Sequence, residues 1–102
     1  MVEEIKAKMP SKREIEDVSN LFKVLGDPTR AKILFSIEDN ELNVTDICNC
    51  VDMNKSAVSS QLRILRDAKL VKARRDGKEV FYSLDDEHVT IIFKYAREHI
   101  NE

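Results

Sequence analysis

With 102 residues, the chain has room for a single domain with a modest core. Two Gly, two Pro and 6% aromatic residues, against 35% charged residues, favour a helix-rich fold over a sandwich or barrel. No apolar stretch approaches the length of a membrane span and the N-terminus has no apolar signal-peptide core, so we expect a cytoplasmic protein without a membrane partner.

Residues 1–10 carry no strong pattern and predict a flexible N-terminal arm, whereas residues 11–102 predict a single domain. Ser11 and Glu14 form a capping-box signature at the start of that domain. Apolar residues then recur at helical spacing as far as Leu25, which predicts a first long helix.

A second helix follows directly. Gly26 ends the first helix, and Asp27 with Pro28 can serve as the N-cap and first residue of the next one. The core face of this second helix is predicted to carry Ile33, Leu34 and Ile37.

Two helices separated by a tight turn come next. Residues 44–51 predict a short helix, and Asn54 can cap a longer helix that runs to about Ala68. The buried stripe of the longer helix is predicted to be Val58, Leu62 and Leu65. A polar and basic face is then left exposed, which is the arrangement of a helix-turn-helix.

A hairpin is predicted after this pair. Asp76-Gly77 lies between two strand-like runs, and this dipeptide is a strong short-range hairpin signal. From Asn54 to Lys78 there are eight basic residues against two acidic ones, although the whole chain has a net charge of −2. A basic hairpin after a polar helix indicates a wing whose Arg and Lys can reach phosphates or the minor groove. We therefore expect a mostly α fold with a small β-hairpin wing, an α+β winged helix-turn-helix.

A final helix is expected to open at Asp85 or Asp86. The apolar residues that it offers for packing are Ile92, Phe93, Ala96 and Ile100.

This last segment carries four potential metal ligands in one register: Asp86, His88, His99 and Glu102. The two His are the only ones in the chain, and on a helix they would lie about 16 Å apart along the axis at about 1.5 Å per residue. Zinc–nitrogen bonds are only about 2 Å long, so one chain cannot bring both ends to one metal. Two antiparallel copies of the helix can, and the spacing therefore predicts both a metal site and a symmetric homodimer.

The ordered set of motifs resembles the ArsR/SmtB family of metal-responsive winged-helix repressors over roughly residues 13–102. The matching segments are Leu25-Gly26-Asp27-Pro28-Thr29-Arg30, Asn54-Lys55-Ser56-Ala57-Val58-Ser59-Ser60-Gln61-Leu62, and Asp76-Gly77-Lys78 leading to Phe81-Tyr82-Ser83-Leu84.

The resemblance implies a homodimer that binds operator double-stranded DNA, dimerises through its first and last helices, and is released from DNA by metal. Carried over onto this chain, the recognition helix offers Lys55, Ser56, Ser59 and Ser60. Arg63 lies one turn further along, and Arg74, Arg75 and Lys78 are the wing candidates for backbone contacts.

The resemblance also implies which metal site is used. One family site needs two cysteines at positions where this chain has Asn43 and Thr45, so soft-metal sensing there should be lost. The other site lies on the C-terminal helix, and this chain matches all four of its ligand positions. Two nitrogen and two carboxylate ligands suit Zn²⁺, with Co²⁺ as a surrogate.

Two alternatives remain open. A redox-controlled repressor could use Cys48 or Cys50, and a DNA-binding dimer could hold zinc for a purely structural purpose. An enzyme is not expected, because the sequence has no nucleophile–base set or phosphate loop, and a metal with four protein ligands leaves no position for substrate.

Overall fold

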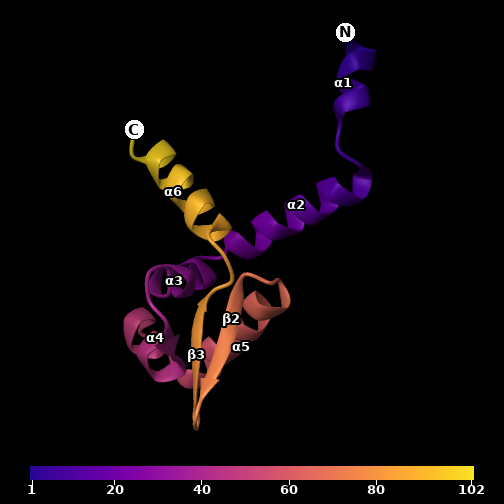
Figure 1. Ribbon diagram of the computed structural model, residues 1–102. Helices are drawn as coiled ribbons and strands as arrows, with labels where there is room; N and C mark the ends of the chain where they lie inside the picture. The colour runs from indigo at the N-terminus through magenta and orange to yellow at the C-terminus, as the bar shows by residue number, and fades with distance from the viewer.

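The computed structural model describes all 102 residues, which form six helices and three strands (Figure 1). In chain order the elements are α1 (Val2–Lys8), α2 (Lys12–Leu25), α3 (Pro28–Ser36), β1 (Leu42–Asn43), α4 (Val44–Val51), α5 (Lys55–Asp67), β2 (Val71–Asp76), β3 (Glu79–Leu84) and α6 (His88–Ile100). The predicted α+β class is confirmed. None of the helices combines the length and the apolar character that a membrane crossing requires.

Side-chain caps begin α2, α3 and α5, as predicted. Each cap satisfies one of the backbone amides that the first turn of a helix leaves without a partner. Ser11 Oγ accepts a hydrogen bond from the amide of Glu14 at 3.1 Å, Asp27 Oδ2 from that of Arg30 at 3.0 Å, and Asn54 Oδ1 from that of Ala57 at 2.8 Å.

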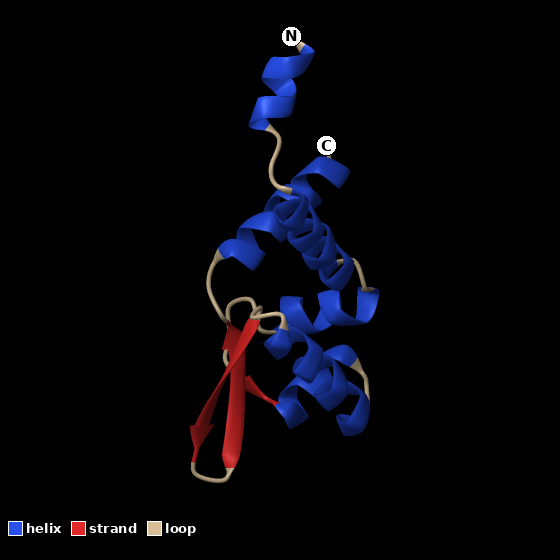
Figure 2. Ribbon diagram, turned by 90° about the vertical axis from the view of Figure 1, so that its right-hand side faces the viewer, coloured by secondary structure: helices blue, strands red, loops and turns tan.

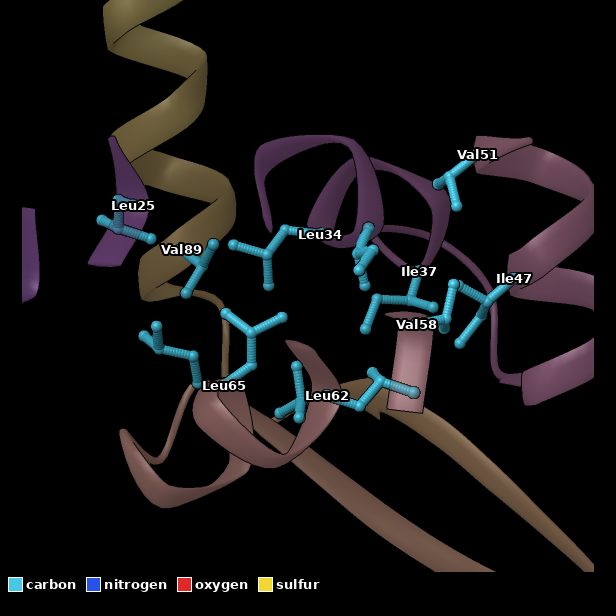
Figure 3. Packing of buried hydrophobic residues seen from close by; sticks show 12 residues of the cluster. Leu25, Leu34, Ile37, Ile47, Val51, Val58, Leu62, Leu65 and Val89 are labelled. Atoms are coloured by element: carbon cyan, nitrogen blue, oxygen red, sulfur yellow. The ribbon is translucent and has the colours of Figure 1, made fainter. Parts of the chain in front are cut away.

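The hydrophobic core lies where α3, α4 and α5 meet (Figure 3). The predicted core faces are confirmed, because the following side chains are all buried: Ile33, Leu34, Ile37, Val58, Leu62 and Leu65. Val89 of α6 and Leu25 of α2 join the same cluster and tie these two helices to it. Burying one such side chain contributes about 1.5–3 kcal/mol.

The hairpin forms where it was predicted. β2 and β3 pair in antiparallel register from Val71 opposite Leu84 to Asp76 opposite Glu79, which leaves Gly77 and Lys78 as a two-residue loop. Gly77 has a φ of +64°, a conformation that glycine adopts without a Cβ penalty.

A third strand, β1, was not predicted. It pairs with the free edge of β3, with Leu42 opposite Tyr82 and Asn43 opposite Phe81, so the strand order is β1-β3-β2. Two residues are too few to produce the alternation by which a strand is recognised in sequence.

The last helix begins later than predicted. Glu87 is its N-cap and His88 its first residue, while Asp86 lies just outside and accepts a hydrogen bond from the His88 amide at 2.9 Å. Asp86 therefore satisfies an amide of the first turn without being the N-cap itself.

The helices α1, α2 and α6 project away from the core, and both termini lie at the end opposite the hairpin tip (Figure 2). α1 has no buried residue, and the flexibility expected of residues 1–10 stays a prediction. Three apolar residues along α2 are exposed: Ile15, Val18 and Phe22. Their spacing places them on one helix face that nothing in the chain covers.

Candidate DNA-binding face and metal-ligand helix

α5 is anchored by its buried stripe and turns its other face to solvent. Val58 and Leu65 are fully buried. The α5 residues predicted to contact DNA all lie exposed on the remaining surface of the helix: Lys55, Ser56, Ser59, Ser60 and Arg63. The structure therefore brings these five side chains together on one element, and their contacts with DNA stay predictions.

A contact that the sequence did not indicate fixes α5 against α3. Arg30 Nε donates to Gln61 Oε1 at 3.0 Å in a partly buried position, and the pair spans 31 residues of sequence. Hydrogen bonds to a charged donor are roughly twice as strong as neutral ones. The contact therefore helps to fix the orientation in which α5 presents its exposed face.

Arg74 and Arg75 lie on opposite faces of the hairpin. Arg74 pairs with Phe81 and Arg75 with Val80, and successive side chains of a strand alternate between faces. Val71 shares the face of Arg75 and is 3% exposed within the core. Arg75 therefore lies on the side that faces the helices, and Arg74 lies on the outer side.

The guanidinium of Arg74 is already engaged. Its Nη2 donates to Glu41 Oε1 at 2.7 Å, its Nε lies 3.1 Å from both carboxylate oxygens, and it stacks 5.2 Å above the Phe81 ring centre. The hydrogen bond from Arg74 lowers the pKa of Glu41, and the same bond raises the pKa of Arg74. Lys78, by contrast, is exposed in the loop at the hairpin tip.

Asn43 has a structural task in this fold. Its Oδ1 caps α4 by accepting the Asp46 amide at 2.8 Å, while its Nδ2 donates to Glu79 Oε1 of the wing at 3.1 Å. One side chain thus joins the first helix of the helix-turn-helix to the hairpin. Both of its polar ends are used in these contacts.

The exposed face of α6 carries the predicted ligands together with apolar residues. His88, Ile91, Tyr95 and His99 follow one another at intervals of three or four, which places them on one stripe of the helix. Ile91 is 42% and Tyr95 65% exposed, so this stripe is apolar between the two histidines and uncovered in the chain.

Asp86 and His88 are brought together at the start of α6. Asp86 Oδ1 lies 3.0 Å from His88 Nδ1, and both side chains are open to solvent, at 52% and 80% exposed. Hydrogen bonds from the His88 amide and then from its side chain lower the pKa of Asp86, which keeps the carboxylate ionised. An accessible carboxylate beside an imidazole is a donor set that suits Zn²⁺.

His99 and Glu102 lie at the other end of the helix. His99 is the twelfth residue of α6, about 16 Å along the axis from His88. The helix ends at Ile100, so Glu102 lies two residues beyond its last turn. No three metal-ligating side chains come close enough in the single chain to hold an ion, and the two halves of the predicted ligand set stay separate.

The two cysteines of α4 are unpaired. Cys48 is half-buried against the core and Cys50 is exposed. Two residues apart on a helix, their side chains point to roughly opposite sides.

An exposed polar helix after a tight turn, followed by a hairpin wing, defines a winged helix-turn-helix DNA-binding protein. The sequence profile described as "Bacterial regulatory protein, arsR family" matches residues 27–73. The chain is 36% identical over 101 residues to a "Transcriptional repressor SmtB homolog" of Synechocystis sp., a match that covers 99% of this chain and 76% of the relative. It is 39% identical over 93 residues to a "Cadmium resistance transcriptional regulatory protein CadC homolog" of Staphylococcus aureus, covering 90% and 77% of the two chains.

A solved structure agrees with these sequence matches. The homodimeric winged helix-turn-helix DNA-binding domain of Mb0332 from Mycobacterium bovis superposes with a TM-score of 0.81 at 28% identity, covering 93% of this chain and 91% of that one. The chain belongs to the ArsR/SmtB family of metal-responsive transcriptional repressors. It is accordingly a transcriptional regulator and not an enzyme.

Proposed function

We propose that the protein is a homodimeric repressor that binds operator DNA and is released from it when Zn²⁺ binds between the two α6 helices. The observation that carries this proposal is the exposed α6 stripe, with His88 at one end, His99 at the other and apolar residues between them. Asp86 and His88 of one subunit, with His99 and Glu102 of the partner subunit, would hold the metal.

The uncovered apolar faces of α2 and α6 support the dimer. Phe22 of α2 is 55% exposed and Tyr95 of α6 is 65% exposed. Apolar stripes on helices are usually covered in stable proteins, because their burial contributes about 25 cal/mol per Å². An antiparallel pairing of two α6 helices covers the stripe and places each His88 beside the partner's His99.

The wing and α5 support the DNA-binding part. Two copies related by a two-fold axis present two such faces to a palindromic operator, which is how helix-turn-helix dimers read half-sites. A cation held by these residues would crosslink the subunits, and an α6 pair fixed in this way would restrict the spacing of the two α5 helices. Linkage requires that operator DNA weaken metal binding by the same factor, with typical couplings of about 1–3 kcal/mol.

A Co²⁺ titration tests the proposal directly. We expect strong visible absorption that saturates at one metal per chain, with operator affinity falling in parallel. His88→Ala should abolish both changes, and a Cys48→Ser/Cys50→Ser double variant should retain them. Operator affinity that does not respond to Zn²⁺ or Co²⁺ would contradict metal release.

Mixing two inactive variants tests whether the site is shared between subunits. His88→Ala and His99→Ala homodimers each lack both sites, but a heterodimer of the two retains one intact site. After subunit exchange of an equal mixture, Co²⁺ absorption should return to about a quarter of the wild-type value, since half the dimers then carry one site of two. No recovery would rule out ligands donated by both subunits.

The alternatives are distinguished by the same measurements. Zinc-dependent release that survives alkylation of both thiols would discard a redox repressor that uses Cys48 or Cys50. Thermal stabilisation by Zn²⁺ without any change in operator affinity would favour a structural zinc.

A further inference from the structure

A groove runs between α5 and the wing. It has a volume of about 410 Å³ and is lined by Ser59, Leu62, Arg63, Arg66, Asp67 and Tyr82. A second depression of about 230 Å³, lined by Ser59, Ser60 and Arg63, adjoins it. Because Ser59 and Arg63 belong to both, the two form one trough along the exposed side of α5.

The hairpin side of the groove carries a tyrosine whose hydroxyl is free. Tyr82 packs against the core, yet it also lines the groove. No buried polar side-chain atom in the chain lacks a hydrogen-bond partner, and the Tyr82 hydroxyl makes no hydrogen bond, so it reaches solvent. Arg75 lies on the same hairpin face, because Ala73 pairs with Tyr82 and strand side chains alternate.

The arginines of the groove are unpaired as well. Neither Arg63 nor Arg66 takes part in an ion pair or side-chain hydrogen bond of the chain, in contrast to Arg74 with its bidentate contact to Glu41. Two free guanidinium groups face one carboxylate, that of Asp67. The groove therefore carries a net positive charge and unused hydrogen-bond donors.

We propose that this groove seats the sugar-phosphate backbone of one DNA strand, with Arg66 and the Tyr82 hydroxyl as phosphate contacts alongside Arg63. A helix in a major groove and a wing over the adjacent minor groove have one phosphate strand between them. In this chain the space between those two elements is the groove. The inference rests on the proposed DNA-binding function and adds two residues to the DNA contacts that the sequence predicted.

The test measures binding of a fluorescent operator duplex and of a scrambled duplex across a range of salt concentrations. Arg66→Ala should weaken binding to both duplexes by about tenfold and reduce the salt slope by about 0.9. Arg66→Lys should keep the slope. Tyr82→Phe, which removes only the hydroxyl, should weaken binding to both duplexes about fivefold without changing the slope.

Lys94→Ala serves as the charge-matched control, because Lys94 is exposed on α6 away from the groove. The DNA affinity and salt slope of Lys94→Ala should equal those of the wild type. Thermal unfolding of each variant checks that it is folded. If the wild type binds DNA and neither Arg66→Ala nor Tyr82→Phe weakens that binding, the groove proposal is wrong and the proposed function stands. A wild type that fails to bind any duplex would overturn the proposed function and the groove with it.

Discussion

The clearest functional prediction separates Arg74 from Arg75, which the sequence presents as an equivalent pair. Arg75 lies on the hairpin face that looks toward α5, whereas Arg74 lies on the outer face and is held by Glu41 at 2.7 Å. We expect Arg75→Ala to remove a phosphate contact from the DNA complex. Arg74→Ala should remove a charge that the Glu41 carboxylate already balances.

The expected magnitude follows from counterion release. Each phosphate neutralised by Lys or Arg contributes about 0.9 to the slope of log affinity against log salt. Arg75→Ala should therefore reduce the slope by about 0.9, and the gap between variant and wild type should narrow by about 3.5-fold from about 50 to about 200 mM salt. Arg74→Ala should leave the slope unchanged.

Fluorescence anisotropy with a labelled operator duplex measures both slopes, and a scrambled duplex shows whether the effect depends on sequence. Arg75→Lys is the matched control, because it keeps the charge and should keep the slope. An Arg74→Ala slope reduced as much as that of Arg75→Ala would refute the assignment of the two faces. The Glu41 contact would then have to exchange for phosphate on binding.

Three further changes test the contacts that build the DNA-binding unit. The hydrogen bond from Arg74 lowers the pKa of Glu41 in the folded state. The contact therefore stabilises the fold at pH values above the unfolded pKa of Glu41, and this stabilisation is lost as pH falls through the folded pKa. The melting temperature of the wild type should exceed that of Glu41→Gln at pH 7, and the two should converge in acid. Asn43→Ala removes the cap of α4 and should lower the unfolding free energy by about 0.5–2 kcal/mol in a urea titration, whereas an unchanged midpoint would contradict the cap. Leu65→Ala, at a fully buried position, should cost about 2–5 kcal/mol in the same assay, and a loss under about 1 kcal/mol would mean that the core is looser than its burial indicates.

Local patterns predicted the hairpin and every helix except α1, because their causes are local. The capping oxygens of Ser11, Asp27 and Asn54 act on amides three residues ahead, and the buried stripe of α5 follows from helical periodicity. The hairpin follows from Gly77 in its loop. Features that act over three or four residues leave a signal that can be read in the sequence.

Contacts between distant segments left no such signal. Glu41 and Arg74 are 33 residues apart, and Asn43 and Glu79 are 36 apart. Both contacts depend on β1, which is too short to be recognised. The sequence therefore indicated a basic wing but could not indicate which of its two arginines is occupied.

The candidate metal site likewise has one feature that local geometry predicts and one that depends on contacts between distant segments. The spacing of His88 and His99 predicted that one chain could not bring both imidazoles to one metal ion. This prediction rested on helix geometry alone. Which elements adjoin each end of α6 is a matter of tertiary structure. At the N-terminal end, the Asp85 amide donates to the Leu70 carbonyl at 3.0 Å, directly after α5.

If the proposed function is right, this connection gives a metal site at the N-terminal end of α6 a short route to α5. The Leu70 amide in turn donates to the Leu65 carbonyl of α5 at 2.9 Å, so two backbone hydrogen bonds link the residue beside Asp86 to the recognition helix. The chain's own His99 lies about 16 Å from His88 along α6, at the free end and away from this link. His88 is the only imidazole that the chain itself places at the end of α6 that adjoins α5, and an antiparallel partner would bring a second one there. A shift of Asp86 toward the partner subunit's His99 would therefore be passed to α5 through its backbone, and the shared ligand set would couple the two functions by placing the metal at that end.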